Sequence, residues 1–463
     1  MDTLQSRYKL EKNFIYYYGL RNRDHLFENK IKVNKKQLAI LKILPKELTD
    51  EEKKILGPKI YGVAVVNEKD LTKVPTSFKE ARFCAKCAAN DFMIPGLEFD
   101  EEGKCPICQC EEDTKDFKAV VPVLNSFPRS KKSRFDVAVF YTGGKDSTYL
   151  LYYLSKVKGY RVLALTWEIP YISLSAKKSI EGAKKMLPKV EFMTRKMDDD
   201  DLRKIYNKLY SLAENTCACP SLAYALFYPE LVNLRVPYFV AGNEPAQMVG
   251  LYFNHMAPKM AYKFGQKKFL NFLVNVGRIL TLHPPLKKGQ IQTLMTMKQL
   301  AYGDNPFKNL AGYRNDLVSN VVTAIHEVPS ILKPLKRAIR YSSWTRHIPA
   351  FVQVDLDDIS GGHYDWRKVM KLLVDECGYC PPESIDKGLH TSCQIEKCKE
   401  YSQFIRFYEM RSTMIPFSAL EISIASAHKN LTREQAIKEC EQELGFSLKE
   451  VKECMIMKAY LEE

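Results

Sequence analysis

The stretch "FDVAVFYTGGKDSTYLL", residues 135–151, joins an apolar run to a helical pattern through two adjacent glycines. The run before the glycines is short, apolar and partly β-branched, as expected of a buried strand. The residues after them continue to Gly159, which is suited to end a helix. The stretch therefore predicts a β-strand, a glycine turn and an α-helix in succession.

The glycine turn has the composition of an anion-binding site. Gly143 and Gly144 let the backbone approach a ligand closely, and the first N–H groups of the helix carry partial positive charge. Lys145 adds a full charge and Ser147 a hydroxyl donor. Asp146 is unsuited to touch a phosphate, and we expect it to hold Mg²⁺ instead. The glycine spacing differs from that of a Walker A loop or a dinucleotide fingerprint.

Strand and helix patterns continue to alternate downstream. We expect further strands at residues 160–169, 189–197 and 237–244, separated by helices at 176–187, 198–215 and 221–236. Residues 350–359, "AFVQVDLDDI", have the composition of one more strand. This alternation predicts an α/β fold with a doubly wound parallel sheet and helices on both faces.

The motif "TGGKDS" resembles the S-G-G-x-D-S signature of the N-type ATP pyrophosphatases, the PP-loop superfamily, with Thr142 keeping the hydroxyl of the first serine. The resemblance implies an adenine nucleotide alpha hydrolase-like sheet. It also implies an enzyme that cleaves ATP between the α- and β-phosphates, adenylates an oxygen of its substrate and lets a nucleophile displace AMP. The glycine turn would hold the pyrophosphate portion of ATP.

Two more strand ends fit this family. "FVAGNEPAQ", residues 239–247, resembles its G-x-N-x-x-(D/E/Q) element, and residues 165–167 end the strand that receives adenine in the superfamily. Ligands of doubly wound sheets lie at the carboxyl ends of the strands. The implied ATP site comprises Tyr141, Thr142, Gly143, Gly144, Lys145, Asp146, Ser147, Leu165, Thr166, Trp167, Gly242, Asn243 and Glu244. Lys145 and Asp146 are its expected catalytic residues.

Four cysteines before this block have the spacing of a zinc ribbon. Cys84-x2-Cys87 is followed, after seventeen residues, by Cys105-x2-Cys108. Two such pairs supply four thiolates to one tetrahedral ion and leave no open position for chemistry. We therefore predict a structural Zn²⁺, with Cys110 outside the ligand set.

A second cysteine cluster lies near the C-terminus. Cys377-x2-Cys380 is followed, after twelve residues, by Cys393-x4-Cys398. A second zinc site is the favoured interpretation, and unrelated free thiols or an iron–sulfur centre are the alternatives.

Cys217 and Cys219, in "NTCACPS", are candidate catalytic thiols, because two thiols two residues apart in a loop can face one site. The tRNA-thiolating PP-loop enzymes carry functional cysteines in this part of the domain, usually as C-x-x-C. The alternative is that both are small buried residues.

A narrower resemblance covers the ribbon and the tail. "RFCAKCAAND…PGLEFDEEGKCPIC" and "SALEISIASAHKNLTREQAIKEC" resemble the N-acetyl sugar amidotransferases of surface polysaccharide and flagellin glycan biosynthesis. The first eighty residues and the second cysteine cluster depart from that family. The resemblance implies a ligase that adenylates a sugar for attack by ammonia, which a separate glutaminase subunit supplies.

The net charge of +15 is concentrated in one region. Residues 256–347 contain fifteen Lys and Arg against three acidic residues, a surplus of twelve. A solvated helical surface is one interpretation, and a basic face for an anionic acceptor is the favoured one. A nucleotide-linked sugar would use a few of these charges. A tRNA would use more, and the candidates for such contacts are Lys263, Lys267, Lys268, Lys333, Lys336 and Arg340.

These features leave three hypotheses. The first is an ATP-dependent, AMP- and pyrophosphate-forming amidotransferase acting on a sugar. The second is a sulfur transferase that thiolates tRNA or another anionic acceptor through Cys217 or Cys219. The third is a zinc-rich nucleic-acid-binding module that keeps the nucleotide site as a sensor.

The sequence predicts five regions and a cytoplasmic location. The N-terminus lacks an apolar signal core and the chain has no run of eighteen apolar residues, so we expect no membrane span and cysteines that act as ligands or catalysts. The regions are an extension of unknown role (1–80), a zinc ribbon (81–113), the ATP-binding domain (134–255), a basic helical acceptor-binding region (256–375) and the second cysteine cluster with C-terminal helices (376–463).

Overall fold

The computed structural model divides the chain into two compact units. The ribbon unit comprises residues 1–112 and 403–449, and the sheet unit comprises residues 113–402 and 450–463. The residues that the structure describes are 1–21, 30–109, 131–214, 219–244, 264–287, 289–303, 316–362, 364–382, 393–444 and 452–462.

The sheet unit is built on a five-stranded parallel sheet in the order β10-β9-β6-β7-β8. Its strands are β6 (Val137–Phe140), β7 (Val162–Glu168), β8 (Glu191–Lys196), β9 (Tyr238–Asn243) and β10 (Ala350–Asp355). The order runs one way from β6 to β8 and the other way from β9 to β10, so the predicted doubly wound sheet is confirmed. The switch in direction lies between β6 and β9.

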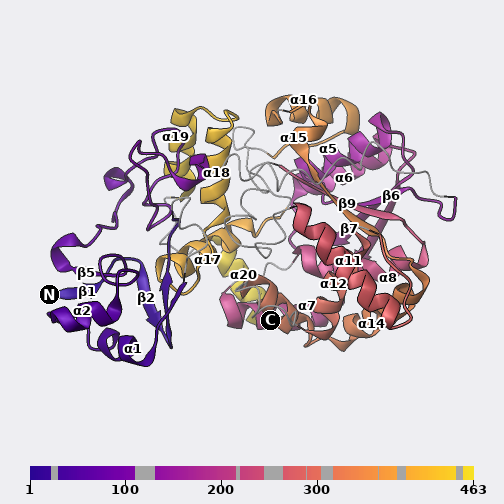
Figure 1. Cartoon of the computed structure of the whole chain (residues 1–463). Helices are drawn as coiled ribbons and strands as arrows, with labels where there is room; N and C mark the ends of the chain where they lie inside the picture. The colour runs from indigo at the N-terminus through magenta and orange to yellow at the C-terminus, as the bar shows by residue number, and fades with distance from the viewer. Residues whose placement is uncertain are drawn as a thin grey trace. The chain divides into compact units, whose positions relative to one another are not determined.

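Helices cover both faces of this sheet (Figure 1). On one side lie α5 (Lys145–Tyr152), α6 (Leu174–Met186) and α16 (Trp366–Cys377). On the other lie α8 (Cys219–Asn233), α11 (Phe264–Leu280), α12 (Gln290–Tyr302) and α14 (Pro329–Thr345). The other helices that the structure describes in this unit are α7 (Asp199–Ala213), α13 (Asp316–Ile325), α15 (Leu356–Ile359) and α20 (Lys452–Glu462), while α17 (Glu396–Tyr408) has residues in both units.

Local chemistry explains where these helices begin. The Asp198 carboxylate accepts hydrogen bonds from the N–H groups of Asp200 and Asp201, and acidic residues fill the first turn of α7, where the helix dipole favours them. The predicted strand at 350–359 ends at Asp355, because its carboxylate accepts from the Asp357 N–H and caps α15.

Hydrophobic cores of the sheet unit lie between the sheet and α8 and among the helices beyond it. Phe227 and Leu231 of α8 pack with Phe239 and Leu163 of the sheet. A larger core joins α7, α8, α12, α13 and α14. The basic region predicted as a separate block thus shares a core with the predicted ATP-binding domain and supplies β10 to its sheet.

The described part of the ribbon unit contains two small antiparallel sheets. One pairs β1 (Asp2–Leu4) with β5 (Val65–Asn67), and the other orders β2 (Tyr8–Glu11), β3 (Phe14–Tyr17) and β4 (Lys30–Lys32). Its described helices are α1 (Lys35–Leu41), α2 (Asp50–Leu56), α3 (Pro106–Gln109), α18 (Phe417–Ala427) and α19 (Arg433–Leu444). Capping boxes at Asn34 and Thr49 start α1 and α2.

Among the described residues, no helix has the length and apolar composition needed to cross a membrane.

Candidate functional site

The glycine turn between β6 and α5 requires glycine at its first position. Gly143 has φ +76°, and a Cβ placed there would lie 2.5 Å from the Ala176 carbonyl oxygen of α6. Gly144 occupies the N-cap position and brings no side chain to the free N–H groups of the first turn of α5. The turn therefore exposes backbone donors at a helix N-terminus, which is the arrangement expected of an anion site.

Hydroxyl groups hold the turn in shape. The Ser147 and Thr148 hydroxyls donate to the Gly144 carbonyl at 3.1 and 2.8 Å. The Thr142 and Ser147 Oγ atoms are 3.2 Å apart, and the Thr142 N–H donates to Ser147 Oγ. Ser147, predicted as a donor to phosphate, acts here within the turn.

Replacing Gly143 by alanine is expected to cost about 3 kcal/mol of stability, because left-handed strain adds to the overlap with Ala176. Gly361 is the matched control, since its φ is +75° but a Cβ there meets nothing within 4 Å. Gly361→Ala should therefore cost only about 1 kcal/mol, the backbone strain alone. Chemical denaturation of the two variants measures both effects, and equal losses would contradict the role of the close approach to α6.

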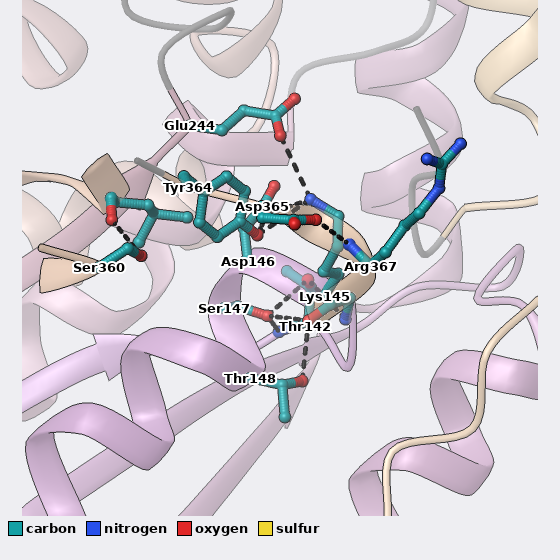
Figure 2. A network of polar contacts seen from close by, with 12 residues as sticks. Thr142, Lys145, Asp146, Ser147, Thr148, Glu244, Ser360, Tyr364, Asp365 and Arg367 are labelled. Atoms are coloured by element: carbon teal, nitrogen blue, oxygen red, sulfur yellow. Dashed lines mark hydrogen bonds and ion pairs between the residues drawn. The ribbon is translucent and has the colours of Figure 1, made fainter. Parts of the chain in front are cut away.

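A buried ammonium links the turn to the end of β9 (Figure 2). Lys145 Nζ lies 2.6 Å from Asp146 Oδ1 and 3.2 Å from Glu244 Oε2, and the Lys145 side chain is only 6% exposed. Glu244 directly follows β9, the neighbour of β6 in the sheet. The structure thus brings together three of the predicted site residues at the switch point of the sheet, where ligands of such folds bind.

Two aromatic residues complete the cluster and were missed by sequence analysis. The fully buried Tyr364 donates its hydroxyl to Asp146 Oδ1 at 2.6 Å, and Lys145 Nζ donates to the same hydroxyl at 3.0 Å. Lys145 Nζ also lies 4.8 and 5.9 Å from the ring centroids of Tyr364 and Trp366. Tyr364 lies just before α16 and Trp366 is its first residue. The only sequence signal for them was that they follow the candidate strand at 350–359.

Burial and charge set the protonation of the cluster. Burial raises the pKa of Glu244 to about 7, against the attraction of Lys145. Burial alone would lower the pKa of Lys145, but Asp146 and Glu244 raise it well above its usual range. Burial and the Asp146 carboxylate raise the pKa of Tyr364. One ammonium thus faces two carboxylates, and these hard oxygen ligands fit a magnesium ion.

The other predicted nucleotide residues lie along the same edge of the sheet. The Tyr141 N–H donates to the Leu165 carbonyl at 2.9 Å, and the Thr166 hydroxyl donates to the Tyr141 carbonyl at 2.9 Å. Asn243 Oδ1 accepts from the Gln353 side chain at 3.0 Å. Gly242 packs beneath Leu150 and Leu356 of the flanking helices, and Trp167 is partly buried in the core. Their contact with a nucleotide stays a prediction.

The first cysteine quartet is assembled in the ribbon unit. The Sγ atoms of Cys84, Cys87, Cys105 and Cys108 all lie within 4.8 Å of one another. The Cys84–Cys108 and Cys87–Cys105 sulfur distances are 3.9 and 3.6 Å. Backbone N–H groups of Lys86 and Ala89 donate to Cys84 and Cys87 sulfurs, as in a metal-binding knuckle. These four thiols form a candidate metal centre.

The tail of the ribbon unit contacts this centre. The Arg433 guanidinium of α19 donates to the Cys84 carbonyl at 3.1 Å and lies 6.0 Å from the centroid of the Phe83 ring. The two segments that carry the amidotransferase resemblance thus meet in one compact unit.

The second cysteine cluster is not gathered into a ligand set. Among the described residues, only the first quartet brings three or more ligand atoms close together, although Cys377, Cys380, Cys393 and Cys398 are all described. Burial raises the pKa of Cys377 to about 12, and Cys398 lies in the apolar core. The structure therefore gives the second zinc site no support.

The candidate catalytic thiols cannot be placed. Cys217 lies outside the described residues, as does the side chain of Cys219, the first residue of α8.

No protein-family model and no curated protein matches the chain. Among solved structures, the chain is similar to the U34-tRNA thiolase NcsA from Methanococcus maripaludis with its [4Fe-4S] cluster. The sequence identity is 16% and the TM-score 0.24, over 56% of this chain and 89% of that one. Similarity at this level transfers neither a site nor an activity to this chain.

Proposed function

We propose that the sheet unit binds ATP at the glycine turn and cleaves it to AMP and pyrophosphate while adenylating an acceptor. The observation that carries this proposal is the Lys145–Asp146–Glu244 cluster at the switch point, beside an uncapped helix N-terminus and an obligatory glycine. The S-G-G-x-D-S-like motif is the link to the PP-loop superfamily.

The residues divide the work of phosphate binding. Backbone N–H groups in the first turn of α5 receive the pyrophosphate portion, and Lys145 supplies the positive charge beside it. Asp146 and Glu244 would hold Mg²⁺, which neutralises phosphate charge when bound. An acceptor oxygen then forms a bond to the α-phosphorus as the bond to the pyrophosphate oxygen breaks, and a second nucleophile later displaces AMP from the acceptor.

Tyr364 competes with the metal for Asp146, because its hydroxyl donates to the same carboxylate oxygen that faces Lys145. Tyr364→Phe keeps the ring and removes this donor. Since a hydrogen bond to a charged group contributes about 1.5–3 kcal/mol, we expect Mg²⁺ to bind roughly tenfold more tightly in the presence of ATP. Calorimetric titration of Mg²⁺ measures this change, and unchanged or weaker binding would contradict the competition.

The metal of the ribbon unit is proposed to be a single Zn²⁺. Four thiolates at the usual Zn–S distance of about 2.3 Å form a tetrahedron with edges of about 3.8 Å. The 3.6 and 3.9 Å sulfur distances agree with that edge. A four-iron cluster would hold the cysteine sulfurs outside a cube of irons and therefore farther apart.

Within this activity, we propose nitrogen transfer to a sugar or nucleotide-linked sugar in surface glycan biosynthesis, with ammonia from a glutaminase partner. The contact of α19 with the cysteine ribbon supports it, because both segments carry the amidotransferase resemblance. The exposed Lys333 and Arg340 of α14 fit an anionic acceptor and therefore also the alternative, tRNA thiolation.

Cys217→Ser and Cys219→Ser separate these two functions. Serine keeps the shape of cysteine but cannot carry sulfane sulfur or bind a soft metal. Nitrogen transfer from ammonium salts should change by less than about tenfold, whereas thiolation would be abolished with ATP binding intact. Mass spectrometry of the product gives the answer, and a gain of sulfur mass would favour the alternative.

A further inference from the structure

Helix α11 presents large apolar side chains to solvent. Phe269, Phe272 and Ile279 are 61, 63 and 57% exposed, and Leu280 is 79% exposed. Together with Leu273 and Val276 they recur at steps of three and four residues, which places them along one side of the helix. This apolar stripe consists of Phe269, Phe272, Leu273, Val276, Ile279 and Leu280.

The polar side of α11 is turned inward and fixed there. Asn275 Oδ1 accepts from the Leu286 N–H, and its amide donates to the Leu286 carbonyl, both at 2.9 Å. The buried Arg278 donates to the carbonyls of Pro284 and Ser343 at 3.0 and 2.8 Å. Rotating the helix to bury the apolar stripe would break the hydrogen bonds of the Arg278 guanidinium, and leaving this charge without partners costs free energy. The hydrogen bonds of Asn275 and Arg278 therefore keep the apolar stripe facing solvent.

A basic and aromatic stripe on α14 adjoins α11. Arg337, Arg340, Tyr341 and Trp344 follow one another at helical spacing and are all exposed. The Trp344 ring stacks on His283, just beyond α11, with 4.1 Å between centroids. Arg278 of α11 also donates to the Ser343 carbonyl of α14, so the C-terminal ends of the two helices are in contact. Both helices lie on the same side of the sheet (Figure 1).

We propose that this joined surface docks the protein peripherally on an anionic lipid bilayer. Exposed Phe, Leu and Ile side chains insert at the acyl boundary, Trp and Tyr lie at the headgroup level, and arginines attract anionic lipids. The exposed Arg337 and Arg340 supply the complementary charge.

The charge pattern disfavours a second copy of the chain. A two-fold interface would place like arginine stripes near each other, since the same patch is used on both subunits. The region holds only three acidic residues, and Glu327 among them already pairs with Lys208 at 3.3 Å. Four of the six residues of the apolar stripe are aliphatic and, unlike Phe269 and Phe272, offer no ring for stacking a nucleic-acid base.

Vesicle flotation with the full chain tests the proposal. The probes are vesicles of phosphatidylcholine alone and of phosphatidylcholine mixed with an equal amount of phosphatidylglycerol. The wild type should bind the anionic vesicles and leave the neutral ones largely free. Phe272→Glu/Ile279→Glu should lower the binding at least about tenfold, and Arg337→Glu/Arg340→Glu roughly tenfold or more. Lys371→Glu, at an exposed lysine of α16, changes the net charge by the same amount as Phe272→Glu/Ile279→Glu. It is the control for that variant and should bind like the wild type.

Because the substituted residues are exposed, these variants should fold like the wild type, and circular dichroism checks this. ATP binding of Phe272→Glu/Ile279→Glu should also be unchanged. The proposal is overturned if the wild type does not bind anionic vesicles. It is also overturned if Phe272→Glu/Ile279→Glu and Arg337→Glu/Arg340→Glu bind as well as Lys371→Glu. Two other results would show that the surface binds another partner and would also overturn the proposal. One is a dimer of the wild type that Phe272→Glu/Ile279→Glu converts to monomer. The other is tRNA binding that depends on Arg337 and Arg340 but not on the apolar stripe.

Discussion

Replacing Lys145 by methionine is expected to lower the rate of AMP release by roughly 10²- to 10³-fold, because the ammonium beside the phosphates is lost. The same change leaves Asp146 and Glu244 without their buried cation, which should also cost about 3–5 kcal/mol of stability. AMP release is followed by nucleotide chromatography with a cell extract as the source of acceptor.

A double variant separates catalysis from stability. Lys145→Met/Glu244→Gln removes the ammonium together with one of its carboxylates, so most of the stability should return while AMP release stays low. Lys156→Met is the matched control, because Lys156 lies just beyond α5 and pairs with Glu376 at the surface, where such pairs contribute about 1 kcal/mol or less. Recovery of both stability and AMP release in the double variant would assign Lys145 a structural role alone.

Loss of one ribbon cysteine is expected to have the largest effect on folding. Cys84→Ser or Cys105→Ser breaks the four-thiol set, and structural zinc contributes on the order of 10 kcal/mol to the folding of small ribbons. Metal analysis of protein purified without oxygen should find one zinc per chain, absent from these variants together with the fold of the ribbon. Arg433, which contacts the Cys84 carbonyl, should then lose its partner.

Cys380→Ser is the control, because Cys380 belongs to the cluster that the structure does not assemble. It should keep the zinc content and the stability of the wild type. A second zinc that Cys380→Ser removes would restore the second metal site predicted from the sequence. Metal-free protein that is folded and active would contradict the structural role of the quartet.

The sequence predicted the fold because its signals are local. The apolar run before Gly143 forms β6, and the strands predicted at 160–169, 189–197 and 237–244 end within one or two residues of β7, β8 and β9. The cysteine quartet was also predictable, since fixed spacing within each pair determines where the two thiols point.

The rest depended on contacts between distant residues. Tyr364 reaches Lys145 across 219 positions of the chain, and only the register of β10 in the sheet brings it there. The second cysteine cluster has plausible spacing, but the structure does not bring three of its thiols together at one point. The exposure of the apolar side of α11 was likewise not predictable from the sequence. Helical periodicity shows that the helix has two sides, but only the hydrogen bonds of Asn275 and Arg278 determine which side faces the protein.

A structure of the protein with Mg²⁺ and a non-hydrolysable ATP analogue tests the central claim most directly. The account predicts the phosphates at the first turn of α5, within hydrogen-bond distance of backbone N–H groups after Gly143, with Lys145 beside them and Tyr364 displaced from Asp146. Nucleotide bound elsewhere, with the turn unoccupied and the Tyr364–Asp146 contact intact, would contradict it.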